Sequence, residues 1–355
     1  MKLDILRKRF EREDKFPFLV QDLVNIRYLT GFIGSSALLL LDADGDYFIS
    51  DSRYEEYARS IIPSGMEFVL MRGTAVKTIS GIIRRSRRGR LFLEDHTTTL
   101  SQYCALKKAL HQVDLREGGS PVNELRMAKE PGEIETIRAA VDLSDRCFKH
   151  ILSMAKAGML EWDLSVEIEY FYRKNGCRKT SFDSIVASGA GSSMPHYLTS
   201  MTKKLEKGDA LLIDMGCEYD GYNSDLTRTI FINSVDEDLS KIYGIVREAQ
   251  ERAIEAVRPG ISCGTLDSVA RSSIGAAGYE DAFGHSLGHG VGMEVHEIPA
   301  VKSGGRTKLR KNMVITVEPG IYIPGKGGVR IEDVVLVTGE GSEILTKSSK
   351  DIHIV

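Results

Sequence analysis

The chain has 355 residues, of which 42% are hydrophobic and 27% are charged. This composition is typical of a soluble globular protein with sizeable cores, and the length favours two domains. Lys and Arg together number 47 against 50 Asp and Glu, so the net charge is -3. Because nucleic-acid binders and anionic-membrane binders need a basic surplus, neither class of protein is expected.

Neither a membrane span nor a signal peptide is expected. The longest purely apolar run, Ala37 to Leu41, is far short of the ~20 residues that span a bilayer. The opening MKLDILRKRFERED is too charged for a signal peptide. The five cysteines are scattered, which indicates neither a disulfide framework nor a zinc-thiolate site. We therefore expect a cytoplasmic protein.

Residues 1–123 mix strand-like runs, such as ALLLLDADGDYFIS and RLFLED, with helical ones. This mixture predicts an α/β domain. The basic run RRSRRGR over residues 84–90 contains no aromatic residue, so a solvated helix end is favoured over a phosphate-binding patch. The segment EGGSP at 117–121 breaks the pattern, and we place the domain boundary near residue 123.

Residues 124–355 repeat one order of elements. Apolar residues recur at helical spacing from Pro131 until Gly158, and a second helix is expected from Trp162 to about Lys174. The strands LLID and YNSDLTRTIFI follow. Further helices are then predicted near 239–257 and 265–276, followed by the runs VITVEPGIYI and VRIEDVVLV.

An internal match supports this repetition. Gly158 and Gly176 match Gly260 and Gly278 at one offset of 102 residues (260 − 158 and 278 − 176). So few positions can also match by chance. The sharper interpretation is a pair of related helix-helix-hairpin halves, each with carboxylates at the end of an apolar strand.

Asp214 and Asp225 form the first carboxylate pair. A tight turn near 219–221 would make their strands antiparallel, with Asp225 opposite Asp214 or Gly216 and both carboxylates on one face. Two like charges on an apolar face need a cation, a shared proton or open water. Ordinary surface acids on a solvated hairpin are the alternative.

Glu318 and Glu332 repeat this arrangement. The loop PGKGG is centred on residue 325, the midpoint of the two glutamates, so a hairpin places them opposite each other. Both lie in apolar runs, where an uncompensated acid is costly. Arg330 as a charge partner is the alternative explanation.

Histidines gather in the same part of the chain. The stretch GHSLGHGVGMEVHE contains His285, His289 and His296, and SSMPHY contains His196. The glycines of GHSLGHGVGMEVHE disfavour a helix and predict an extended segment. A lone histidine is usually a polar core residue, but this cluster with four acids favours metal binding. An oxygen-rich ligand set with an imidazole suits two Mn²⁺ or Co²⁺ ions, whose charge balances four carboxylates.

The segment GHSLG around Ser286 also matches the G-x-S-x-G pattern of a serine-hydrolase nucleophile elbow. An elbow requires a strand before the serine and a helix after it. Here the segment follows YED and precedes a glycine-rich stretch. A serine hydrolase therefore remains only a remote alternative.

The motifs IDMGCEYDGYNSDLTRT, GHSLGHGVGMEVHE, TVEPGIY and GVRIED together resemble the "pita-bread" metallopeptidases, which include methionine aminopeptidase, aminopeptidase P, prolidase and the metal-free creatinase. This resemblance extends from about Glu124 to the C-terminus. TGFIGSSALLL and DSRYEEYA resemble the creatinase-type amino-terminal domain of the Xaa-Pro branch. The resemblance implies an α/β creatinase-type domain over 1–123 and an α+β pita-bread catalytic domain with a pseudo-twofold repeat over 124–355.

Position by position, the resemblance implies five metal ligands. They are Asp214, Asp225, His289, Glu318 and Glu332. Asp225 and Glu332 are expected to bridge two ions, and Glu318 to serve also as an acid or base. Because all five are present, whereas creatinase has lost them, the resemblance implies a hydrolytic dimetal site.

The resemblance assigns roles to four more residues. His196 and His296 match histidines that act around the substrate carbonyl and in proton transfer. His285 is expected to lie behind the ligands, and Arg330 to support Glu332.

One position departs from the prolidase pattern. Prolidases commonly carry an arginine shortly after the third histidine, in an HExPR-like stretch, whereas this chain reads HEIPA and ends that stretch at Ala300. Either Lys302 or Arg306 takes over recognition of the substrate carboxylate, or longer peptides are accepted. We therefore predict a homodimeric Xaa-Pro dipeptidase, with aminopeptidase P as the alternative and a non-catalytic interaction module as a remote one.

Overall fold

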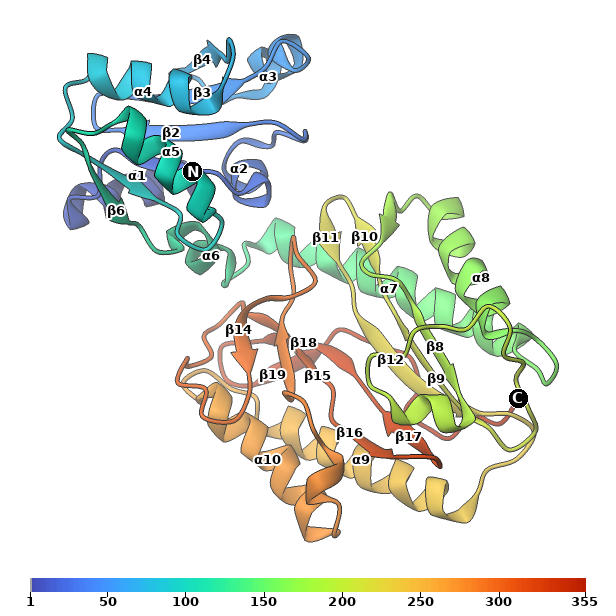
Figure 1. Cartoon of the computed structure of the whole chain (residues 1–355). Coiled ribbons are helices and arrows are strands. Elements are labelled where there is room, and N and C mark those ends of the chain that lie inside the picture. Colours follow the sequence, from blue (N-terminus) through green and yellow to red (C-terminus); the bar gives the residue numbers. More distant parts are fainter. Residues whose placement is uncertain (1) are drawn as a thin grey trace. The chain divides into compact units, whose positions relative to one another are not determined.

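The structure is a computed structural model that describes residues 2–355 (Figure 1). The chain divides into two compact units, the first ending at Arg126 and the second spanning Met127–Val355. The predicted boundary near residue 123 falls within the short helix α6 (Pro121–Arg126), with which the first unit ends. Within residues 2–355, no helix has the length and apolarity to cross a bilayer.

The first unit is built on a six-stranded mixed sheet in the order β4-β3-β2-β1-β5-β6. Its strands are β1 (Phe18–Val20), β2 (Leu38–Asp42), β3 (Gly45–Ser50), β4 (Met66–Leu70), β5 (Arg90–Leu93) and β6 (Asp114–Glu117). The other helices of this unit are α1 (Lys2–Glu13), α2 (Leu23–Thr30), α3 (Glu55–Ile61), α4 (Ala75–Arg85) and α5 (Leu100–Ala109). The predicted α/β architecture is confirmed.

Strand alternation divides the core of this unit between the two sheet faces. Leu19 of β1 packs in one cluster with Ile82 of α4 and Leu106 of α5. Its neighbour Phe18 stacks instead on Phe10 of α1, with ring centroids 4.6 Å apart. The basic run at 84–90 begins in the exposed last turn of α4, as predicted, but continues to the first residue of β5, and its Arg88 pairs with Asp42.

The second unit begins with a long helix at the predicted residue. α7 (Pro131–Met154) starts at Pro131, where a proline costs no hydrogen bond, and ends four residues before Gly158. The other helices are α8 (Glu161–Lys174), α9 (Glu237–Ala256), α10 (Cys263–Ala276) and the short 3₁₀ helices η1 (Gly189–Ser193) and η2 (Glu280–Ala282). The predicted helices are thus confirmed to within a few residues.

The strands of the second unit form two related groups. The first group is β7 (Lys179–Thr180), β8 (Ile185–Ser188), β9 (Ala210–Met215), β10 (Cys217–Tyr219), β11 (Tyr222–Asn223) and β12 (Leu226–Phe231). The second group is β13 (Gly288–Gly290), β14 (Glu297–Val301), β15 (Val314–Val317), β16 (Gly320–Ile323), β17 (Gly327–Arg330), β18 (Asp333–Val337) and β19 (Ser342–Ile344). The acids lie at the sheets β12-β9-β8, with three strands, and β14-β13-β15-β18-β19, with five.

The two halves are built alike, as predicted. α7 and α8 share an apolar cluster with β9 and β12, and α9 and α10 share another with β15 and β18. Figure 1 shows the two helix pairs on opposite sides of the strands. The matched glycines also share a left-handed backbone, with φ of 89° at Gly158 and Gly260, 92° at Gly176 and 86° at Gly278. Glycine adopts this conformation without the steric cost of a Cβ.

Both predicted hairpin registers are confirmed. Thr227 pairs with Asp214 in β9 and β12, and continuing this register places Asp225 opposite Gly216, one of the two predicted partners. Val317 pairs with Asp333, and Gly320 pairs with Arg330. The pairing is interrupted between these two positions, but the register is the same on both sides of the interruption. Glu318 therefore lies opposite Glu332.

Gly216 offers a direct test of this packing. A Cβ added there would lie 2.1 Å from the carbonyl oxygen of Ser224, so we expect Gly216→Ala to lower the free energy of unfolding by roughly 1–3 kcal/mol. The matched control is Gly244→Ala in α9, where an added Cβ meets nothing within 4 Å. Because alanine favours helix, this control should raise stability by about 1 kcal/mol. Urea unfolding of both variants measures the difference, and equal effects would contradict the proposed close approach.

Candidate metal centre

Four acidic side chains lie where the paired strands of the second unit break. Asp214 is in β9, Asp225 precedes β12, Glu318 follows β15, and Glu332 precedes β18. Asp225 and Glu332 are buried, whereas Asp214 and Glu318 are partly exposed. The two hairpins therefore each supply one buried and one partly exposed carboxylate.

His289 of β13 faces these acids. Its Nε2 lies 3.6 Å from an Asp225 oxygen and 3.3 Å from a Glu318 oxygen. Its Nδ1 lies 3.1 Å from the Gly290 carbonyl oxygen, so a proton on Nδ1 donates to that carbonyl and leaves the Nε2 lone pair toward the carboxylates. Asp225, His289 and Glu332 each offer one ligand atom, and these atoms lie within 4.8 Å of one another.

The charge of these acids is only partly balanced by the protein. Burial raises the pKa of Asp225 well above its usual range, and Glu332 and Asp214 raise it further. Burial likewise raises the pKa of Glu332, with added repulsion from Glu318 and Asp214. Among residues 2–355, Oδ1 of Asp214 is buried without a hydrogen-bond partner.

The neighbouring Asp333 shows the opposite behaviour. Burial would raise its pKa, but the charges of Arg228 and Lys350 outweigh burial and lower it. The charge of Asp333 is therefore neutralised within the fold, while the four acids beside His289 share the buried cation of Arg330, which pairs with Asp214. An oxygen-rich set with one imidazole, an orphaned carboxylate oxygen and surplus negative charge fits divalent cations of the Mn²⁺ class.

Arg330 supports the acids through two routes. Its Nη2 donates to Asp214 at 2.5 Å, and its Nε donates to the Thr227 hydroxyl at 3.1 Å. That hydroxyl donates in turn to Glu332 at 2.7 Å. Arg330 thus pairs directly with Asp214 and reaches Glu332, which the sequence predicted as its partner, only through Thr227.

The predicted histidines lie around the same acids. The rings of His289 and His296 have centroids 4.3 Å apart. His285 Nε2 lies 2.8 Å from the Tyr322 hydroxyl, which also accepts from Arg330 at 3.0 Å. Burial lowers the pKa of His285 and of His296. Both rings are therefore neutral at pH 7.

The position of His196 is set by contacts to the backbone of the segment that carries it. It is exposed in a turn after η1, and the carbonyl of the preceding Pro195 accepts from Arg330 at 3.3 Å. The buried carboxylate of Glu161 accepts from the backbone N–H groups of Ser188 and Ser200 at 2.8 and 3.1 Å. This carboxylate therefore fixes both ends of the segment that carries His196.

Sequence reasoning missed three of these residues. They are Glu161, Thr227 and Tyr322. Thr227 lies inside the quoted motif DLTRT, two residues after Asp225, so strand alternation places it on the face of Asp225, and this signal could have linked it to the acids. Glu161 and Tyr322 are identified only by their contacts with distant segments.

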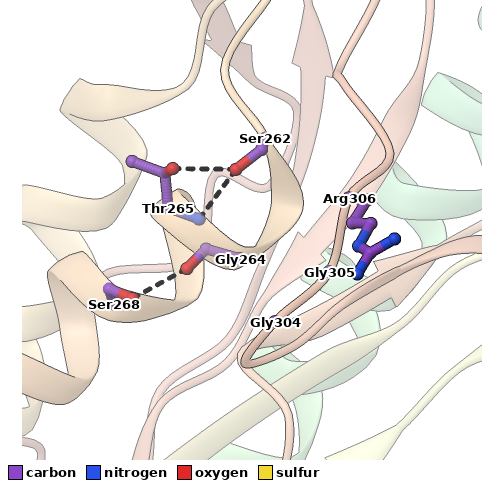
Figure 2. Close-up of a pocket in the computed structure, with 7 residues that line it drawn as sticks. All are labelled: Ser262, Gly264, Thr265, Ser268, Gly304, Gly305 and Arg306. Atoms are coloured by element: carbon purple, nitrogen blue, oxygen red, sulfur yellow. Dashed lines mark hydrogen bonds between the residues drawn. The ribbon is translucent and has the colours of Figure 1, made fainter.

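The remaining candidates lie elsewhere. Ser286 is followed by strand β13 and not by a helix, so the elbow hypothesis is wrong. Lys302 and Arg306 are exposed. Figure 2 shows Arg306 lining a pocket with the first turn of α10, where Ser262 and Thr265 also lie. None of the seven residues that line this pocket is a predicted ligand or histidine.

The chain belongs to metallopeptidase family M24, whose model matches residues 135–339. A second model, the creatinase/prolidase N-terminal domain, matches residues 2–128. The chain is therefore a peptidase of a family that uses divalent metal ions, and its second unit has the pita-bread fold.

Individual relatives agree with this family. The chain is 44% identical to an Xaa-Pro dipeptidase of Pyrococcus horikoshii over 247 aligned residues. The aligned region covers 70% of each of the two chains. An Xaa-Pro dipeptidase structure from Bacillus anthracis has a TM-score of 0.95 at 38% identity, covering 100% of this chain and 99% of the other. An X-Pro aminopeptidase structure from Thermotoga maritima MSB8 has a TM-score of 0.88 at 36% identity, covering 98% and 100%.

The surplus charge predicts a gain in stability when one acid is removed. With metal chelated, an ionised Asp225 disfavours the folded state above its raised folded-state pKa. Asp225→Asn should therefore raise the free energy of unfolding at pH 7 by on the order of 1 kcal/mol. This gain should vanish as pH falls below the unfolded-state pKa of 3.8.

Asp333→Asn is the matched control, because it changes an adjacent buried acid whose pKa is lowered. The ionised Asp333 stabilises the fold above its unfolded-state pKa, so Asp333→Asn should lower stability at pH 7, with the loss fading in acid. Urea unfolding in chelator at several pH values measures both variants. Destabilisation by both would contradict the charge imbalance.

Proposed function

We propose that this chain is a dinuclear-metal peptidase that hydrolyses the Xaa-Pro bond of dipeptides or short peptides. The observation that carries the proposal is the convergence of acids with unbalanced charge beside the His289 imidazole. The residues that would hold two ions, Mn²⁺ or Co²⁺, are Asp214, Asp225, His289, Glu318 and Glu332. The names of the dipeptidase relatives support the substrate class.

Bound divalent ions supply Lewis acidity that polarises a carbonyl and lowers the pKa of water toward neutrality. Burial would raise the pKa of Glu318, but without metal the hydrogen bond and charge of a protonated His289 outweigh it and lower the pKa. When His289 instead binds a cation through Nε2, Glu318 would be kept ionised by the charge of the bound ions, so it would be able to accept a proton from the attacking water. His196 and His296 would donate hydrogen bonds to the scissile carbonyl oxygen as negative charge develops on it.

The proline specificity has a chemical reason. An Xaa-Pro bond is a tertiary amide without an N–H, so a peptidase that depends on binding that group handles it poorly. In this proposal the carbonyl side of the bond provides recognition through His196 and His296. The second unit would carry this chemistry as the catalytic domain, from about residue 124 onward, and residues 1–123 would form the creatinase-like domain of a cytoplasmic homodimer.

The dipeptidase names of the relatives favour dipeptides slightly over longer peptides as substrates, whereas one residue near the site points the other way. Ala300 pairs with His289 across β13 and β14, and paired residues share a face of the sheet. A small side chain therefore stands beside the site where prolidase-like sequences carry arginine. Of the two candidate substitutes, Lys302 follows β14 directly and Arg306 lies four residues further along the chain. Aminopeptidase P activity on longer peptides is the second candidate function, and Ala300 is the observation that favours it.

Activity on proline peptides after metal removal and return tests the proposal. We expect hydrolysis of Ala-Pro and Met-Pro to be lost in chelator, restored by Mn²⁺ or Co²⁺, and unaffected by Ser286→Ala. Comparison with Ala-Pro-Ala measures the preference for chain length. Hydrolysis that resists chelation, or absence of hydrolysis in the fully metal-loaded protein, would overturn the proposal.

Ala300→Arg tests the assignment of the carboxylate site. An arginine beside His289 should bind the free carboxylate of a dipeptide with about 1.5–3 kcal/mol, lowering KM for Ala-Pro by roughly tenfold to a hundredfold. Ala300→Gln, of similar length without charge, should leave KM nearly unchanged. An equal fall in KM for Ala-Pro and for a tripeptide amide would show that the arginine does not bind the carboxylate.

A further inference from the structure

We propose that Arg228, Asp333 and the C-terminal residues 348–350 form a buried clamp that sets the position of Glu332 relative to Asp225. These residues are named the clamp below. They are not predicted to touch metal or substrate, so they act as positioning residues. The inference rests on the proposed function, because it concerns the placement of two of its metal ligands.

The guanidinium of Arg228 is the centre of the clamp. This side chain is 1% exposed, and a guanidinium has five N–H donors. It makes five hydrogen bonds. Nε donates to the Ser349 carbonyl, Nη1 to the carbonyls of Thr227 and Glu332, and Nη2 to the Asp333 carboxylate and the Ser348 carbonyl.

Asp333 completes the buried side of the clamp. Its carboxylate accepts from Arg228 at 2.7 Å, from Gln250 of α9 at 2.8 Å and from Lys350 at 3.1 Å. A buried ion pair is a weak source of stability compared with well-packed apolar residues. Its placement directly beside Glu332 indicates that it contributes position.

The position matters because the two ligand-bearing hairpins are parts of different sheets. β12 lies in the sheet β12-β9-β8, and β18 lies in the sheet β14-β13-β15-β18-β19. Glu332 donates its backbone N–H to the Thr227 carbonyl at 3.1 Å. Arg228 then binds the carbonyls of both of these residues, so it joins the strand that follows Asp225 to the backbone of Glu332.

The C-terminal segment closes the clamp from outside. Its carbonyls at Ser348 and Ser349 accept from Arg228, and Lys350 donates to Asp333. The segment is itself fixed by β12, since Phe231 donates to the His353 carbonyl at 2.9 Å. The end of the chain is therefore a structural part of the candidate metal centre.

Metal affinity measured on clamp variants tests this inference. Lys350→Met removes one outer donor, Arg228→Lys keeps the charge but lacks the five-donor fork, and Arg228→Met removes both. We expect Mn²⁺ affinity, measured by competition with a fluorescent chelator, to fall tenfold to a hundredfold in Arg228→Met and by less in the other two. The kcat for Ala-Pro should fall with KM nearly unchanged.

Arg247→Met is the matched control. Arg247 also binds the C-terminal segment, through Asp351 at 2.9 Å, but this pair is exposed. Its loss should leave Mn²⁺ affinity and kcat unchanged. If Arg228→Met does not fold, as judged by urea unfolding in chelator, Lys350→Met and Arg228→Lys decide the question.

The possible outcomes separate two failures. A wild-type chain that binds no Mn²⁺ and cleaves no proline peptide would overturn the proposed function. A wild-type chain that does both, with folded clamp variants that bind Mn²⁺ as tightly as it does, would overturn the clamp alone. Lower stability of these variants without a change in Mn²⁺ affinity would show a merely structural role and would also overturn it.

Discussion

Repulsion among buried carboxylates is the constraint on which the second unit depends. Burial and neighbouring acids both raise the pKa of Asp225 and of Glu332. If stability alone shaped this region, apolar residues would serve better, because uncompensated buried charge is costly. The unit instead keeps a surplus of negative charge that divalent cations would neutralise. Metal binding and folding are therefore governed by the same electrostatic balance.

The paired halves explain how such a site is built. In each hairpin, strand register alone brings two carboxylates together, so Asp214 lies near Asp225 and Glu318 lies opposite Glu332. A single hairpin would place acids on only one side of a bound metal ion. Two related hairpins bring ligand atoms of Asp225 and Glu332 within 4.8 Å of each other and of His289, which is supplied by the neighbouring strand β13. Repetition of a simple unit thus yields an oxygen-rich cage.

Sequence predicted the parts of this architecture that local physics determines. Helical spacing located α7 and its first residue, and the loop centred on residue 325 gave the register of Glu318 and Glu332. The contacts that orient the acids were not predicted, because their partners are far apart in the chain. Thr227 and Glu332 are 105 residues apart, and Glu161 is 27 residues from Ser188. Spacing patterns carry no information about such pairs.

The adjacent acids Glu332 and Asp333 show how the fold separates function from support. Successive residues of an extended chain point to opposite faces. Glu332 faces the other acids, and its pKa is raised, whereas Asp333 faces Arg228 and its pKa is lowered. One negative charge is thus left for a cation while the next is neutralised by the protein itself. Since ligand binding stabilises a fold according to affinity and free concentration, metal adds to the stability that this internal pairing supplies, and its removal leaves the pairing in place.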